Sequence, residues 1–254
     1  MTTTTPPWVG RFVWHDLMTT DAERSQAFYR ALLGWNIEAK PVGPFTYNVI
    51  STASGEIGGM VEEKAIPMSH WMPYCAVPDV DAAAARCKEL GGSVCVPPTD
   101  IPGTGRFAVC GDRQGAYFSI FAGTPNTPGA DPDVMAHGRV CWNELMTSDD
   151  ADAQKFYSDL FGWAPQPMDM GEMGLYRVQM AGEKHAGGIM RSPMPEAPSW
   201  WCVYFTVDDL AKSTSQAREL GAKVMVENQP IPEIGTFSLL QDPVGAMVAL
   251  FQNR

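Results

Sequence analysis

Apolar and polar positions along this chain alternate with the period of a strand in some segments and with that of a helix in others. The same order of strand-like and helix-like segments occurs four times. Residues 11–19 alternate with a period of two, as expected for a strand with one buried face. An apolar stripe at helical spacing follows, in which Phe28 and Leu32 stand four residues apart, and Gly34 suits the left-handed position that ends a helix. Thr20 precedes this stripe and is the expected N-cap. Three short strands are predicted after the helix, over residues 35–39, 45–50 and 56–61.

A second segment has the same order of elements. Residues 71–77 predict a strand, and Asp79 or Asp81 is expected to cap a helix that ends at Leu90. Three further strands are predicted over residues 94–97, 105–111 and 116–121.

The chain then repeats itself after roughly 130 residues. Nine residues recur in identical order, namely Trp14, Leu17, Met18, Asp21, Gln26, Phe28, Tyr29, Gly34 and Trp35 as Trp142, Leu145, Met146, Asp149, Gln154, Phe156, Tyr157, Gly162 and Trp163.

This repeat predicts two homologous domains, residues 8–122 and 137–254, joined by a linker over 123–136 that is rich in Pro, Gly and Asp. Each domain would hold two βαβββ modules. The expected fold class is therefore α+β, with four modules whose curled mixed sheets form cups and whose helices lie outside.

Composition narrows the class of partner. The net charge of −11 argues against nucleic acid and anionic membrane surfaces as partners. Apolar runs stay short of the ~20 residues that cross a bilayer, and the N-terminus does not read as a secretory signal. The six cysteines form no C-x-x-C pair and are expected as reduced, buried thiols. We expect a cytoplasmic monomer or homodimer whose partner is a small molecule.

Several motifs carry a resemblance to a known family. The first strand of each copy is followed by Thr-Asp or Ser-Asp, then by a Phe-Tyr pair and a helix ending in Gly-Trp, and residues 242–245 form a D-P-x-G turn. This pattern resembles the vicinal oxygen chelate superfamily, which includes glyoxalase I, bleomycin-resistance proteins and extradiol dioxygenases. The resemblance covers nearly the whole chain and is nearest to tandem glyoxalase-like proteins of actinobacterial type.

The resemblance implies a divalent metal held by the first strand, the fifth strand and a glutamate on the last strand of a domain. The matching positions are Trp14, Met72 and Ser119 in the first copy and Trp142, Cys202 and Ala249 in the second. These side chains are not the usual ligands of an open catalytic site. We therefore expect no metal and no other cofactor. The glycine pairs at 58–59 and 187–188 predict close strand approach or a bulge rather than a phosphate loop.

A carboxylate recurs on the first strand of each copy, as Asp16 and Glu144, and the resemblance places it on the inner face of the cup. It is the candidate general base or ligand-anchoring acceptor. The alternative is a structural carboxylate paired with Arg106 or Arg177. Aromatic and thioether side chains suit flat organic ligands. The candidate ligand-binding residues are Trp14, Met18, Met72, Trp142, Met146, Cys202 and Arg106.

Three functions remain open at this level. The first is metal-independent binding of a hydrophobic or aromatic small molecule, in antibiotic resistance or secondary metabolism. The second is an enzyme, a lyase, isomerase or hydroxylase-like protein. It would use Asp16 and Glu144 as acid and base, or a non-standard metal site drawn from His15, His70, His185 and Glu144. The third is a structural or interaction protein whose cup is filled by its own side chains.

Overall fold

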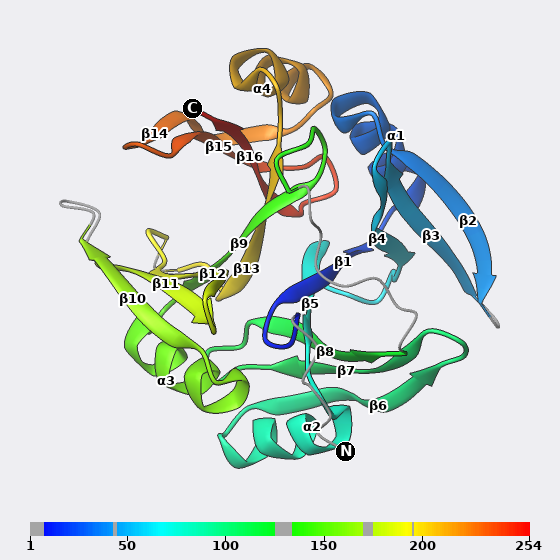
Figure 1. Cartoon of the computed structure of the whole chain (residues 1–254). Coiled ribbons are helices and arrows are strands. Elements are labelled where there is room, and N and C mark those ends of the chain that lie inside the picture. The colour runs from blue at the N-terminus through cyan, green and yellow to red at the C-terminus, as the bar shows by residue number, and fades with distance from the viewer. Residues whose placement is uncertain (1–7, 43–44, 125–133, 170–174, 195) are drawn as a thin grey trace. The chain divides into compact units, whose positions relative to one another are not determined.

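The structure is a computed structural model that describes residues 8–42, 45–124, 134–169, 175–194 and 196–254. Four modules of βαβββ order follow one another along the chain (Figure 1). The first module comprises β1 (Phe12–Thr19), α1 (Ala22–Leu33), β2 (Asn36–Val42), β3 (Phe45–Thr52) and β4 (Gly55–Glu62). The second comprises β5 (His70–Ala76), α2 (Val80–Glu89), β6 (Ser93–Ile101), β7 (Gly105–Gly111) and β8 (Tyr117–Gly123).

The second sequence copy provides the other two modules. The third comprises β9 (Val140–Thr147), α3 (Asp150–Phe161), β10 (Ala164–Asp169), β11 (Leu175–Ala181) and β12 (Lys184–Arg191). The fourth comprises β13 (Trp200–Thr206), α4 (Leu210–Glu219), β14 (Lys223–Ile231), β15 (Gly235–Gln241) and β16 (Met247–Asn253). The predicted order of elements is confirmed. Most of the predicted linker lies outside the described residues.

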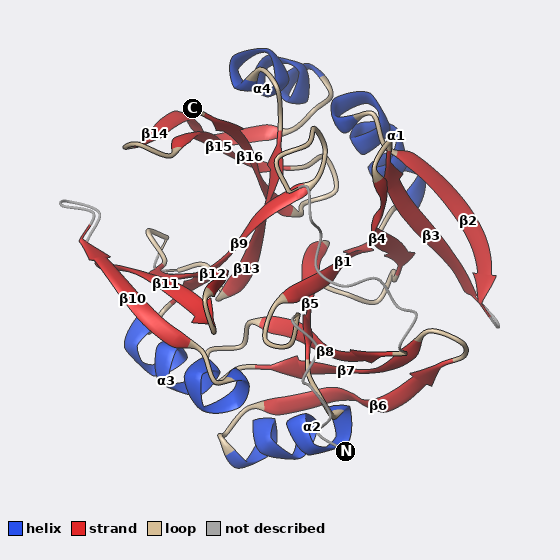
Figure 2. Cartoon of the chain, in the orientation of Figure 1, coloured by secondary structure: helices blue, strands red, loops and turns tan. Residues whose placement is uncertain are grey.

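Each copy provides one curled, mixed sheet of eight strands, in the order β2-β3-β4-β1-β5-β8-β7-β6 for the first and β10-β11-β12-β9-β13-β16-β15-β14 for the second. Within a module the first and fourth strands pair in parallel and the rest are antiparallel. Helices cover one face of the strands (Figure 2). The α+β fold class and the tandem βαβββ modules predicted from the sequence are thus confirmed. None of the described helices is long and apolar enough to cross a membrane.

The start of α1 differs from the sequence prediction by one residue. Asp21, not Thr20, caps α1, and its side chain accepts a hydrogen bond from the backbone N–H of Arg24. A carboxylate at this position also interacts favourably with the positive end of the helix dipole. Of the two caps predicted for α2, Asp79 is the one observed, and it caps the helix in the same way. The C-terminal prediction is confirmed, because Gly34 has φ 66° and ends α1 in the left-handed conformation.

The chain divides into two compact units, and each unit takes one module from each copy. Unit 1 contains residues 1–13, 73–130 and 143–201, and so holds most of the second and third modules. Unit 2 contains residues 14–72, 131–142 and 202–254, and holds most of the first and fourth. Within unit 1, α2 packs beside α3, and within unit 2, α1 packs beside α4 (Figure 1). Each unit has its own apolar core.

In unit 2 a buried polar network joins the two copies. The Tyr29 hydroxyl of α1 donates to Asp242 Oδ2 at 2.9 Å and accepts from the Trp71 indole N–H at 3.1 Å. Asp242 Oδ1 in turn accepts from the backbone N–H groups of its own turn. Trp35 stacks on Tyr29 with ring centroids 5.0 Å apart and donates to Gly138 O at 2.8 Å. The Phe-Tyr and Gly-Trp motifs of the first copy therefore bind residues of the second.

Unit 1 contains the same network with the copies exchanged. Tyr157 donates to Asp112 Oδ2 at 3.0 Å and accepts from Trp201 at 3.0 Å. Trp163 stacks on Tyr157 and donates to Gly10 O. Every polar group of this network is buried, so each needs its partner.

Burial also changes the ionisation of these groups. It raises the pKa of Asp112 and of Asp242, although hydrogen bonds from backbone N–H groups and from tyrosine act in the opposite direction. Burial, followed by the charge of the neighbouring aspartate, raises the pKa of Tyr29 and of Tyr157 well above its usual value. Both tyrosines therefore remain neutral donors in the folded protein.

Candidate functional site

A hydrogen-bonded cluster of two aromatic residues and a carboxylate lies on the first module of unit 2. Leu17 of β1 belongs to the core together with Phe28 of α1, so strand alternation turns Asp16 to the face away from the helix. The Trp14 indole N–H donates to Asp16 Oδ1 at 3.0 Å and to the Tyr47 hydroxyl at 2.7 Å. Tyr47, on β3, donates to the same Asp16 Oδ1 at 2.7 Å. We call these three residues the Trp14–Asp16–Tyr47 cluster.

The cluster combines a fixed carboxylate with accessible aromatic surface. Asp16 is buried, with 5% of its surface exposed, whereas Trp14 and Tyr47 are half-buried. Each of the two aromatic side chains is oriented by hydrogen bonds. Such an arrangement presents ring surface for stacking and a carboxylate that accepts hydrogen bonds.

Gly59 of β4 makes the cluster possible. It stands opposite Asp16 in the parallel β1–β4 pair. A Cβ at this position would lie 2.0 Å from the Tyr47 hydroxyl oxygen and 2.7 Å from Asp16 Oδ1. Any larger residue would therefore displace the tyrosine from the aspartate. The neighbouring Gly58 has a different role, because a Cβ there would meet the His15 carbonyl oxygen at 2.1 Å, which is the close strand approach predicted from the sequence.

The second copy has the same residue types in the same register. Glu144 of β9 stands opposite Gly188 of β12, as Asp16 stands opposite Gly59. Glu144 is buried, with 6% of its surface exposed. Tyr176 precedes the residue of β11 that pairs with Ile189, which gives it the strand position that Tyr47 has on β3. With Trp142 two residues before Glu144, the Trp, the carboxylate and the Tyr of the cluster recur, together with the glycine opposite the carboxylate.

Sequence reasoning identified Trp14, Asp16, Trp142 and Glu144 but missed the two tyrosines. The alternation of β1 alone placed Trp and Asp on one face. The tyrosines come from β3 and β11, whose register against β4 and β12 is not visible in a strand's own pattern. The recurring glycine pair was the available signal, because it marks the strand that leaves room for a neighbouring side chain.

The remaining candidate residues are mostly closed to solvent. Met18 is half-buried, whereas Met72, Met146 and Cys202 are buried, with 5%, 4% and 0% of their surface exposed. Their role as ligand-binding residues stays a prediction.

The two arginines considered as partners of the carboxylates have other partners. The Arg106 guanidinium binds Asp81 at 2.8 Å and Asp100 at 2.7 Å, and its hydrogen bonds lower the pKa of Asp81. Arg177 binds Asp150 at 3.0 Å. The part proposed for Arg106 in ligand binding stays a prediction.

The positions that would hold the metal of similar proteins do not fit one. Trp14, Met72 and Ser119 in the first copy offer no imidazole or carboxylate, and in the second copy Cys202 is the one side chain of a ligating type. No group of three or more His, Cys, Asp or Glu side chains among the described residues is placed to hold a metal ion. His15 is buried on β1, and its counterpart is Asn143.

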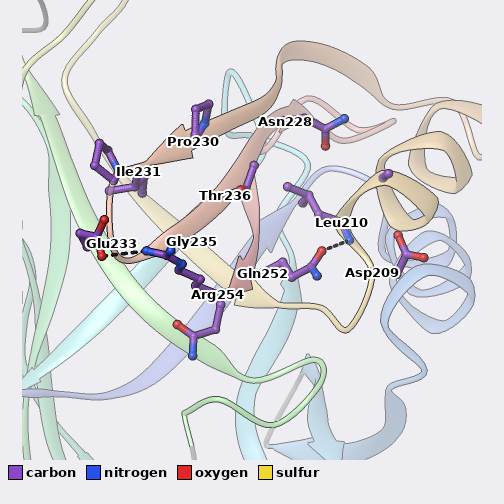
Figure 3. Close-up of a pocket in the computed structure, with 13 residues that line it drawn as sticks. Asp209, Leu210, Asn228, Pro230, Ile231, Glu233, Gly235, Thr236, Gln252 and Arg254 are labelled. Atoms are coloured by element: carbon purple, nitrogen blue, oxygen red, sulfur yellow. Dashed lines mark hydrogen bonds and ion pairs between the residues drawn. The ribbon is translucent and has the colours of Figure 1, made fainter.

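A separate concavity lies in the fourth module of unit 2 (Figure 3). Its volume is about 620 Å³, and it lies between the start of α4 and the strands β14, β15 and β16. Thr236, Pro230 and Asn228 line it, and Asn228 has a left-handed φ of 49°. Gln252 closes one side by accepting a hydrogen bond from the Leu210 backbone N–H at 2.8 Å.

Family models match both copies of the chain. The model described as bleomycin resistance protein-like N-terminal matches residues 11–52. The model described as glyoxalase/bleomycin resistance protein/dioxygenase superfamily matches residues 139–250.

Two kinds of curated relative are similar over nearly the whole length. "Putative glyoxylase CFP32" of Mycobacterium tuberculosis is 34% identical over 246 residues, which covers 94% of this chain and 93% of that protein. "Anthracycline biosynthesis protein DauV" of a Streptomyces species is 29% identical over 272 residues, covering 96% of this chain and 94% of that protein.

Solved structures share the fold at low sequence identity. A manganese-bound glyoxalase from Novosphingobium aromaticivorans has a TM-score of 0.69 at 16% identity, covering 96% of this chain and 82% of that chain. Homoprotocatechuate 2,3-dioxygenase from Arthrobacter globiformis has a TM-score of 0.69 at 15% identity, covering 99% of this chain and 82% of that chain. At these identities the likeness concerns the fold alone.

Proposed function

Because the chain belongs to the glyoxalase, bleomycin resistance protein and dioxygenase superfamily, we propose that it binds a planar aromatic small molecule at the Trp14–Asp16–Tyr47 cluster, without the superfamily's metal. The observation that carries this proposal is the cluster itself. Hydrogen bonds of 2.7–3.0 Å hold two half-buried aromatic rings around one carboxylate. Ordered aromatic surface binds flat ligands at little cost in side-chain entropy.

The recurrence of the residue types supports the proposal. A Trp, a carboxylate, a Tyr and a Gly occupy the same register in both copies. Unlike the buried Tyr–Asp–Trp networks, whose side chains are closed to solvent, Trp14 and Tyr47 keep part of their ring surface exposed. The second copy is therefore a second candidate site, with Glu144 in place of Asp16.

The relatives bear on the kind of ligand. The Streptomyces relative is named for anthracycline biosynthesis. On that ground we place this protein in the binding or handling of an aromatic secondary metabolite, which it would retain or pass on. The cytoplasm is the proposed compartment, since all six cysteines are free thiols and a reducing compartment maintains them.

Isothermal titration calorimetry tests the proposal on protein treated with a chelator. 2-(Aminomethyl)naphthalene serves as the planar probe and (aminomethyl)cyclohexane as the matched non-aromatic one, because both are cations at pH 7 and neither is repelled by the Asp16 carboxylate. We expect the first to bind and the second not to bind, and Trp14→Ala to weaken binding about tenfold or more, as for loss of a stacked aromatic contact. Asp100→Asn, in an exposed ion pair of unit 1, is the control variant.

The contrary outcomes are equally definite. Stoichiometric Ni, Zn, Fe or Mn in the purified protein, needed for binding, would contradict the metal-free part. If no aromatic probe changes the melting temperature, the result would instead favour a protein whose inner face is filled by its own side chains.

A second candidate function is proton transfer by Asp16. The short hydrogen bond from Tyr47 orients the carboxylate, as a general base requires. In this case the protein would speed the exchange of the acidic C–H protons of 2-tetralone in D₂O, followed by NMR. Asp16→Asn with Glu144→Gln should abolish that exchange and leave the fold intact. Equal exchange rates with and without wild-type protein would dismiss this function for such ketones.

A further inference from the structure

We infer that the concavity beside the start of α4 is a separate binding site, for an uncharged, hydroxyl-rich molecule of about the size of a sugar. The residues of the Trp14–Asp16–Tyr47 cluster do not line this concavity, so the inference goes beyond the proposed function. Its basis is a comparison of equivalent positions in the second and fourth modules.

In unit 1 an arginine lies across the equivalent place. Arg106 of β7 stands opposite Asp100 of β6, and its guanidinium bonds that carboxylate at 2.7 Å. The same guanidinium bonds Asp81, two residues after the N-cap of α2, at 2.8 Å. Three charged side chains therefore connect the two strands to the start of the helix.

In unit 2 the same place is open. At the same register, Thr236 of β15 stands opposite Pro230 of β14. Ala211 follows the N-cap of α4 by two residues, as Asp81 follows the N-cap of α2. With uncharged residues at all three positions, a concavity of about 620 Å³ lies between the start of α4 and the strands (Figure 3). This volume is typical of small-molecule sites.

Uncharged polar groups line the concavity. Gln252 is oriented by its Oε1, which accepts from the Leu210 N–H at 2.8 Å, so its Nε2 offers two donors. Among the described residues, neither this Nε2 nor the hydroxyl of the half-buried Thr236 has a hydrogen-bond partner. Asn228 adds an exposed amide, and Ile231 adds apolar surface for the C–H groups of a ring. Hydroxyl groups both donate and accept, so they can pair with all of these polar groups.

Each charged residue of the lining already has a partner in the protein. Asp209 caps α4 by accepting from the Lys212 N–H at 2.9 Å, and Glu233 bonds Arg254 at 2.7 Å. A cation would lack the two aspartates that bind Arg106 in unit 1. An anion would meet the carboxylates of Asp209 and Glu233. The lining therefore favours an uncharged ligand.

The test follows the backbone amide signals of residues 210, 236 and 252 in the full-length protein by ¹H–¹⁵N NMR. Methyl α-D-glucopyranoside is the uncharged probe, and D-glucuronate and D-glucosamine are charged probes with a similar ring. 2-Methoxytetrahydropyran has the ring without its hydroxyl groups. We expect the glucoside to shift these signals saturably and to bind about tenfold or more tightly than glucuronate and 2-methoxytetrahydropyran. Glucosamine should bind no more tightly than the glucoside.

Variants locate the binding in the concavity. Thr236→Val removes the hydroxyl and keeps the shape, so it should weaken binding about two- to tenfold, the size of one hydrogen bond. The triple variant Ala211→Asp, Pro230→Asp and Thr236→Arg rebuilds the ion pairs of unit 1 in unit 2, and we expect it to abolish binding. Asp100→Asn in unit 1 is the control and should bind as the wild type does.

Three results would overturn the inference. The first is the absence of a saturable shift with the glucoside at tens of millimolar. The second is tighter binding of glucuronate or glucosamine than of the glucoside. The third is unchanged binding in the folded triple variant. If that variant does not fold, unchanged affinity in Thr236→Val has the same meaning.

Discussion

In unit 1 the Cys87 thiol packs against the backbone at Gly92, whereas in unit 2 the equivalent positions hold Ala217 and Ala222. A Cβ at Gly92 would lie 2.7 Å from Cys87 Sγ. The sulfur in one unit thus fills the space for which the other unit uses a methyl group. The exchange of a Cys–Gly pair for an Ala–Ala pair keeps the volume of the core while changing the side chains that fill it.

A second pair of positions shows the same redistribution of side-chain volume. Cys110 pairs with Phe118 in β7–β8, and Leu240 pairs with Val248 at the same register of β15–β16. All four side chains are buried, with at most 1% of their surface exposed. A small residue beside a large one in unit 1 thus corresponds to two of middle size in unit 2. Packing therefore explains the buried Cys87 and Cys110 of unit 1.

The polar networks behave in the opposite way. Tyr29, Asp242 and Trp71 of unit 2 have the same residue types in unit 1, with hydrogen bonds of nearly equal length. A buried hydroxyl and a buried carboxylate require each other, so neither can change alone. The two units therefore teach that volume can be redistributed in these cores, whereas buried hydrogen bonds cannot.

The largest expected effect comes from breaking a polar network. Asp242→Ala leaves the Tyr29 hydroxyl and backbone N–H groups without partners, and we expect it to lower the free energy of unfolding of unit 2 by about 3 kcal/mol or more. Asp112→Ala should cost unit 1 about the same. Guanidinium unfolding followed by tryptophan fluorescence measures both. Strongly unequal losses would show that the networks are alike in geometry but not in energy.

The next effect tests the redistribution of volume. Gly92→Ala alone should destabilise unit 1 by about 1–3 kcal/mol, because its Cβ meets Cys87 Sγ at 2.7 Å and Gly111 O at 2.7 Å. In a Cys87→Ala background the first contact disappears, so we expect the cost of Gly92→Ala to fall by about 1 kcal/mol. A double-mutant cycle by chemical denaturation measures this coupling. Simple additivity would contradict the packing explanation.

Acidity provides a third test, directed at both units together. Burial raises the folded-state pKa of Asp112 and of Asp242, so the protonated forms favour folding. The two carboxyl groups contribute fully to the free energy of unfolding below the ordinary aspartate pKa of about 3.9. This contribution is lost as the pH rises through their raised folded-state pKa values. Relative to Asp112→Asn with Asp242→Asn, the wild type should lose about 1.4 kcal/mol per carboxylate for each unit of pKa difference. Unfolding at several pH values between 3.5 and 7 gives the two curves, and parallel curves would contradict the raised pKa.

The smallest effect concerns the surface. In unit 1, Arg106 stands opposite Asp100 and bridges it to Asp81, whereas at the same register of unit 2 Thr236 stands opposite Pro230 and a concavity of about 620 Å³ opens. Arg106→Ala should lower the melting temperature only slightly, and the change should vanish as salt rises, because exposed ion pairs are screened. A loss that does not depend on salt would mean that the arginine packs as well as pairs.

The sequence predicted the elements and their order because periodicity and capping are local. The alternation of β1 was enough to put Trp14 and Asp16 on one face, and Gly34 was enough to end α1. The pairing of modules between the copies could not be predicted in this way. Tyr29 recurs as Tyr157, and the sequence shows only this recurrence. Their partners could not be predicted, because each tyrosine binds an aspartate in a module of the other copy.

The exchange of modules has a consequence for protein synthesis. In unit 1, Tyr157 and Asp112 are 45 residues apart, and the unit is complete once residue 201 has been made. In unit 2, Tyr29 and Asp242 are 213 residues apart. At about 5–20 residues per second, Tyr29 is made on the order of 10–40 s before Asp242. Unit 1 can thus close first, whereas the side of α1 that packs against α4 waits for the fourth module, although β2 and β4 of its own module already cover another part of the helix.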